Sequence, residues 1–92
     1  MSWKPRTRAD VGDTAPVRAP CCGRRVWPDV LVDCARLPVE VRPRGASDLC
    51  DGCRETLLRD GWVTHEALLV ALGAPPDLVA RARARDVARR TR

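Results

Sequence analysis

The sequence is poor in aromatic side chains and in the residues that most hydrolytic enzymes use. It contains no Phe and no Tyr, three Trp, a single His65, and only two serines, Ser2 and Ser47. A Ser-His-Asp triad would have to be built from this small set, which makes it an unattractive interpretation. The longest apolar run, 67–72, is far shorter than the roughly 20 residues that span a bilayer. We therefore expect neither an enzyme nor a membrane protein.

The length of 92 residues corresponds to one small domain with tails. A domain of this size buries only about 60% of its unfolded surface, and it often needs a metal or a partner to fold stably. Its core is expected to consist of Val, Leu and Ala, with two of the tryptophans. The first residues have no apolar segment of the secretory type, so we expect a cytoplasmic protein.

Charge is distributed unevenly along the chain, which has a formal net charge of +5. Residues 1–25 and 74–92 each carry six basic and two acidic side chains, whereas 26–73 carry five basic and eight acidic ones. Basic ends favour a polyanionic partner, most often DNA or RNA. The alternative interpretation is that an arginine-rich composition serves solubility alone.

The five cysteines form the clearest motif. Cys50 and Cys53 make a Cys-x-x-Cys turn in which two thiolates can point at one ion, and a helix-like segment, 54–60, follows until Gly61. An odd number of cysteines in a cytoplasmic chain argues against a disulfide framework. A metal site is therefore the favoured interpretation, and a redox pair made of Cys50 and Cys53 alone is the alternative.

The region before this motif predicts a turn and two strands. Cys21 and Cys22 lie in a Pro-Cys-Cys-Gly turn. The runs 30–32 and 39–42 are apolar or alternating and read as the two strands of a hairpin, with Cys34 in the connection between them. Residues 19–60 are therefore expected to form, in this order, a turn, a hairpin and a Cys-x-x-Cys motif at the start of a helix.

This order resembles the treble-clef zinc finger. The resemblance implies one structural Zn²⁺ held by four thiolates, which we assign to Cys22, Cys34, Cys50 and Cys53. Cys21 is the alternative to Cys22 or Cys34, because the side chains of adjacent cysteines diverge and rarely bind one ion together. An iron–sulfur cluster also takes four cysteines and stays open as an alternative.

The C-terminal third predicts two helices. Thr64 is a typical N-cap, Gly73 ends the first helix, and Pro76 suits the first turn of a second helix that runs to Arg89 or Arg90. Two helices joined by a short turn that contains Gly are typical of a helix-turn-helix. A plain helical hairpin is the alternative.

The spacing of Thr64, Gly73, Val79 and Arg81 resembles the excisionase and MerR-like helix-turn-helix over residues 62–85. This resemblance implies that the last helix contacts DNA. At helical spacing, a stripe of arginines lies on one side of that helix, with Val79, Ala80 and Val87 on the other. The stripe consists of Arg81, Arg85, Arg89 and Arg92.

A stripe of this kind matches a row of phosphates. The alternative is a solvated face with ion pairs one turn apart, such as Asp86 with Arg90.

The sequence thus predicts a small α+β fold in three parts. A flexible basic arm, 1–18, precedes a zinc-stabilised knuckle and hairpin with a short helix, 19–61, and a helix-turn-helix-like pair, 62–92. The predicted function is a zinc-dependent, nucleic-acid-binding regulator of transcription of bacterial or phage type. The alternative is a zinc-finger adaptor that docks on a larger assembly, such as RNA polymerase or a phage assembly.

Overall fold

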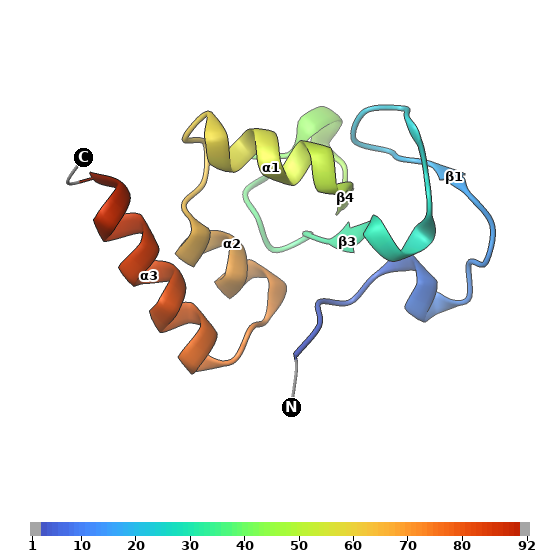
Figure 1. Cartoon of the computed structure of the whole chain (residues 1–92). Coiled ribbons are helices and arrows are strands. Elements are labelled where there is room, and N and C mark those ends of the chain that lie inside the picture. Colours follow the sequence, from blue (N-terminus) through green and yellow to red (C-terminus); the bar gives the residue numbers. More distant parts are fainter. Residues whose placement is uncertain (1–2, 91–92) are drawn as a thin grey trace.

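The computed structural model describes residues 3–90 and has the predicted small α+β architecture. Within this range, two antiparallel hairpins precede three helices. α2 lies between α3 and residues 17–59, which we call the cysteine half of the molecule (Figure 1). The strands are β1 (Val17–Arg18), β2 (Arg25–Val26), β3 (Val32–Asp33) and β4 (Asp48–Leu49). The helices are α1 (Asp51–Arg59), α2 (His65–Leu72) and α3 (Pro76–Arg90).

The strand pairing differs from the predicted hairpin. β1 pairs with β2, and β3 pairs with β4, so that Val32 faces Leu49. The predicted second strand is instead a 3₁₀ turn, η3 (Val39–Val41), whose N-cap is Pro38. Pro38 and Pro43 flank this segment and lack the N–H that would continue a ladder at either end, and the Val41 and Arg42 N–H groups bond locally to the Pro38 and Val39 carbonyls. Prediction of the 30–32 and 39–42 hairpin was therefore wrong.

The core is aliphatic and sulfur-rich. The largest fully buried side chains are Leu31, Leu49, Cys34 and Cys50. The expected contribution of two tryptophans is not seen, since Trp27 is 62% exposed and Trp62 is 65% exposed. Two-residue strands offer little area against which an indole ring could be buried, and the smaller side chains fill the interior.

The helix boundaries follow the predicted caps. The Thr64 hydroxyl accepts a hydrogen bond from the Ala67 N–H at 3.0 Å, and Gly73 ends α2 in the left-handed conformation with a φ of 83°. α3 begins at Pro76 and ends at Arg90, as expected. α1 begins earlier than predicted, because Cys50 is its N-cap and Cys53 therefore lies in its first turn.

The N-terminal arm contacts the second hairpin. Thr7 forms an isolated β-bridge with Val32, the Arg8 N–H donates to the Leu31 carbonyl at 3.0 Å, and the Asp33 N–H donates to the Arg6 carbonyl at 2.9 Å. A single 3₁₀ turn, η1 (Arg8–Val11), follows. Residues 6–8 thus form a third extended segment, which lies beside β3 in addition to β4.

Candidate metal centre and the braced last helix

Two turns that are distant in the sequence bring four cysteines together. Cys21 and Cys22 lie in the turn between β1 and β2, Cys50 follows β4, and Cys53 lies in the first turn of α1. Their sulfur atoms all lie within 4.8 Å of one another. Four sulfur donors on two such turns could hold one metal ion.

The β1–β2 turn is tight, and its geometry explains how adjacent cysteines can share a site. The Ala19 N–H donates to the Arg24 carbonyl at 2.7 Å, and the Gly23 N–H donates to the Ala19 carbonyl at 2.7 Å. Gly23 has a φ of 78°, which is a conformation that favours glycine. The chain therefore curls around the sulfur cluster, and both Cys21 and Cys22 reach it.

Direct contacts tie the two turns to each other. The Cys50 N–H donates to the Cys21 Sγ at 3.3 Å, and the Sγ atoms of Cys22 and Cys50 are 3.7 Å apart. A tetrahedral site with Zn–S bonds of about 2.3 Å places neighbouring sulfurs about 3.8 Å apart. The observed sulfur separation fits one ion bound by all four residues. It fits less well with a multi-iron cluster, whose cysteines bind different iron atoms and must spread farther.

Cys34 is not part of this cluster. Its side chain is fully buried, its N–H donates to the Ser47 carbonyl at 2.7 Å, and burial raises the pKa of its thiol to about 11. The structure thus groups the alternative residue, Cys21, with Cys22, Cys50 and Cys53, and leaves Cys34 in the core. The expectation that adjacent cysteines do not share a site neglected how far a turn can curl.

The thiols of the cluster differ in their proton affinity. Burial raises the pKa of Cys21 and of Cys53. Burial also acts to raise the pKa of Cys50, but hydrogen bonds from the Cys53 N–H and from the neighbouring thiols lower it below its ordinary value. A bound metal ion would deprotonate its thiol ligands.

Two guanidinium groups lie against the cysteine turns. A methyl group built on Gly52 would lie 3.3 Å from the Arg24 Nη1, and one built on Gly23 would lie 3.5 Å from the Arg44 Nη1. Four thiolates around a divalent ion leave a double negative charge. Arg24 and Arg44 are placed to offset that charge, so the surroundings of the cluster fit the donor set.

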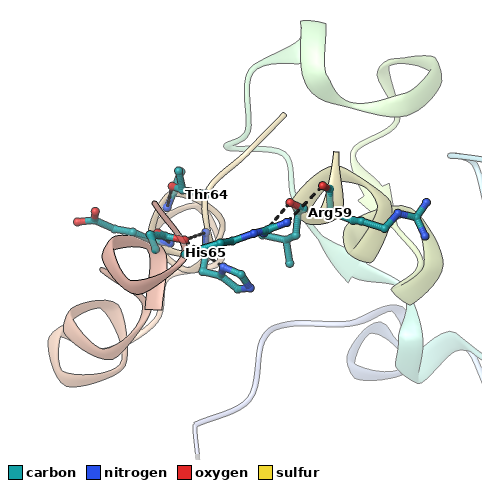
Figure 2. A network of polar contacts seen from close by, with 8 residues as sticks. Arg59, Thr64 and His65 are labelled. Atoms are coloured by element: carbon teal, nitrogen blue, oxygen red, sulfur yellow. Dashed lines mark hydrogen bonds and ion pairs between the residues drawn. The ribbon is translucent and has the colours of Figure 1, made fainter. Parts of the chain in front are cut away.

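A second polar network joins α2 to α3 through Asp86, which is only 8% exposed (Figure 2). The Asp86 carboxylate accepts hydrogen bonds from the backbone N–H groups of His65 and Glu66, each at 3.0 Å, and lies 3.0 Å from the His65 Nδ1. Burial acts to raise the pKa of Asp86, but these hydrogen bonds lower it overall. Asp86 therefore caps the N-terminus of α2 from the neighbouring helix rather than pairing with Arg90.

The buried side of α3 also differs from the prediction. Ala82 and Asp86 are the buried residues of this helix, whereas Ala80 is exposed and Val87 is 51% exposed. Of the three residues expected opposite the arginine stripe, only Val79 is partly buried, and the buried side of the helix is centred on Ala82 and Asp86. The contact face of α3 is hard to recognise from the sequence, because one of its two buried residues is the charged Asp86.

The members of the predicted arginine stripe differ in their surroundings: Arg89 is bound to the end of α1, whereas Arg81 and Arg85 point to no acceptor among the described residues. The Arg89 guanidinium donates to the Leu58 carbonyl at 3.0 Å and to the Arg59 carbonyl at 3.3 Å, at the C-terminal end of α1 (Figure 2). Arg81 and Arg85 are exposed on α3. Arg92 lies outside the described residues.

His65 and Glu66 contribute to the same bracing. The Arg83 Nε donates to the Glu66 Oε2 at 2.8 Å, so Glu66 connects α2 with α3 beside the Asp86 cap. Sequence reasoning missed both Asp86 and Arg89 as bracing residues. The available signal was the one-turn spacing of Ala82 and Asp86, which marks a side of α3 that is distinct from Arg81.

Comparisons with protein-family models, with curated proteins and with solved structures found no match for the chain. Within residues 3–90, none of the helices has both the length and the apolar character needed to cross a membrane.

Proposed function

We propose that the chain is a zinc-dependent nucleic-acid-binding protein that contacts phosphates through the exposed arginines of α3. The observation that carries this proposal is the division of labour along the helix. Asp86, Arg83 and Arg89 are used to fix α3 against α2 and α1. Arg81 and Arg85 are exposed one turn apart, and no ion pair or hydrogen bond within residues 3–90 engages their guanidinium groups.

A fixed helix suits this function because it presents its charges without further ordering. Two arginines four residues apart share a face and offer bidentate donors to successive phosphate groups. Contacts of this kind position a protein on nucleic acid without reading its sequence. The proposal therefore covers DNA and RNA, and the excisionase-like spacing of Thr64, Gly73 and Val79 favours DNA in a bacterial or phage-type regulator.

Zinc has a structural role in this proposal. The cysteine half contains strands of two residues and no buried aromatic side chain among the described residues. A metal ion bound by Cys21, Cys22, Cys50 and Cys53 would hold both turns and the start of α1, since metal-binding free energy is folding free energy in such modules. α1 in turn supplies the carbonyl groups that Arg89 binds.

The test is the salt dependence of binding to a DNA duplex and to a single-stranded RNA. We expect the wild-type affinity to fall with salt at a log–log slope of about −0.9 per phosphate contact on a DNA duplex. Replacing Arg81 and Arg85 together by Ala should flatten that slope by about one to two units. The charge-matched control replaces by Ala the exposed Arg36 and Arg59, which lie in the acidic middle of the chain, and should leave the slope close to that of the wild type.

A second candidate function is a protein-docking adaptor. A shallow apolar hollow of about 430 Å³ lies between the 36–38 segment and α2, and Val70 at its edge is 55% exposed. If the wild type shows no salt-dependent binding to either nucleic acid, this surface becomes the preferred explanation. Changing Val70 to Asp should then abolish capture of a protein partner, whereas the Arg81 and Arg85 changes should not.

A further inference from the structure

The cysteine cluster is open to small molecules from one side. Cys22 and Cys53 are partly exposed, and a surface hollow of about 350 Å³ reaches Cys22, Cys50 and Cys53. The side chains of Arg24 and Arg59 also line this hollow. Cys34, by contrast, is fully buried and lies outside the cluster. A small oxidant can therefore reach the partly exposed thiols of Cys22 and Cys53, whereas Cys50 lies buried behind them and Cys34 is shielded in the core.

The accessible sulfur of Cys22 lies close to the buried sulfur of Cys50. Cys22 and Cys50 belong to separate turns, and their Sγ atoms are 3.7 Å apart. A disulfide bond is about 2.05 Å long, so bond formation would need the two sulfurs to approach by about 1.7 Å. Cys22 lies on the β1–β2 turn, is only partly buried and lines the surface hollow.

We propose that Cys22 and Cys50 form an oxidative modification site, in which a hydroperoxide converts the two thiolates into a disulfide and expels the metal ion. This inference rests on the metal site of the proposed function and goes beyond nucleic-acid binding, because it does not depend on the arginines of α3. Losing two of four sulfur ligands leaves too few donors to close a tetrahedral structural site. The modification would therefore destabilise the cysteine half whenever an oxidant is present.

The chemistry balances with hydrogen peroxide as the oxidant. The Cys22 thiolate attacks one peroxide oxygen, the O–O bond breaks, and hydroxide leaves to give a sulfenic acid. The Cys50 thiolate then attacks the Cys22 sulfur, the S–O bond breaks, the S–S bond forms, and a second hydroxide leaves. The thiolates give up two electrons in total, and two protons convert the hydroxide ions to water. A small dithiol reverses the step by thiol–disulfide exchange.

The experiment uses the reduced full-length chain loaded with zinc and treated with hydrogen peroxide. Remaining thiols are alkylated, and the protein is digested with trypsin without reduction. Cleavage after arginine places Cys21 and Cys22 in peptide 19–24, Cys34 in peptide 26–36, and Cys50 and Cys53 in peptide 45–54. We expect peptide 19–24 to be cross-linked to peptide 45–54, zinc to be released in parallel, and peptide 26–36 to carry the alkyl group.

Fragmentation of the cross-linked peptides should place the bond on Cys22 and Cys50. Cys34→Ser is the matched control and should keep the cross-link, whereas Cys22→Ser should lose it. If Cys22→Ser does not fold, the fragmentation of the wild-type peptides decides the question. A loop within peptide 45–54 alone, oxidation of Cys34, or zinc release without any disulfide would overturn the proposal. None of these results bears on the salt slope of the reduced protein, so the two proposals fail separately.

Discussion

The two halves of the molecule are held together by different chemistry. In the cysteine half, residues 17–59, strands of two residues and one helix surround buried aliphatic side chains and a sulfur cluster. In the helical half, residues 64–90, charged side chains bind the ends of helices, as Asp86 does for α2. The comparison teaches that a chain with few aromatic residues can supplement apolar burial by specific polar contacts in one half and by clustered cysteines in the other. The two halves should therefore respond to different perturbations.

The largest effect is expected from Cys53→Ser. Structural zinc contributes about 10–16 kcal/mol in zinc-finger peptides, which is comparable with the whole stability of a small domain. The variant should lose its metal, and backbone amides of the cysteine half should exchange rapidly with solvent. Amide hydrogen exchange measured by mass spectrometry resolves the two halves.

The matched control is Cys34→Ala, which removes a buried sulfur outside the cluster. Its metal content should equal that of the wild type, and the cost should be about 1–2 kcal/mol of unfolding free energy from the small cavity. Loss of metal from Cys34→Ala, with retention in Cys21→Ala, would restore the ligand set first predicted from the sequence.

The next largest effect is expected from Asp86→Asn in the helical half. The amide has one acceptor oxygen where the carboxylate has two, so one backbone N–H of α2 loses its partner. We expect a cost of about 1–3 kcal/mol in urea denaturation. Asp77→Asn, at the exposed first turn of the same helix, should cost less, about 0.3–1 kcal/mol. Equal costs for the two variants would contradict the capping role of Asp86.

The same carboxylate gives the helical half a defined pH dependence. The pKa of folded Asp86 lies below its ordinary value of 3.8, because hydrogen bonds from His65 and Glu66 outweigh burial. Its contribution to stability is therefore fully present above pH 3.8 and is lost as the pH falls through the lowered folded value. Unfolding free energies measured between neutral and acidic pH should fall less steeply in this acid range for Asp86→Asn than for the wild type.

A smaller effect is expected from Arg89→Ala, which removes the link between α3 and the end of α1. Two hydrogen bonds from an exposed guanidinium predict a cost of about 1 kcal/mol. The exposed pair of Arg83 with Glu66 is screened by solvent, so Arg83→Ala should shift the denaturation midpoint less than Arg89→Ala does. A larger shift for Arg83→Ala than for Arg89→Ala would show that the bracing is assigned to the wrong arginine.

Features set by local chemistry could be predicted from the sequence. Thr64 and Gly73 fix the ends of α2 through their own hydroxyl group and backbone freedom, and the structure confirms both. Features that depend on distant partners could not be predicted. The partner of β3 is β4, fifteen or more residues away, and the choice of Cys21 over Cys34 depends on how the β1–β2 turn curls. The hydrogen bonds from Arg89 to α1 could not be predicted either, because their acceptors are backbone carbonyls, which leave no trace in a side-chain pattern.

The central claim is that four cysteines, Cys21, Cys22, Cys50 and Cys53, hold one metal ion that organises the cysteine half. Native mass spectrometry of the reduced, purified chain, combined with elemental analysis, tests this claim most directly. The account predicts one zinc ion per chain, and a chelator that removes it should unfold the cysteine half. A chain that is free of metal and still keeps the same hydrogen-exchange protection in the chelator would contradict the account.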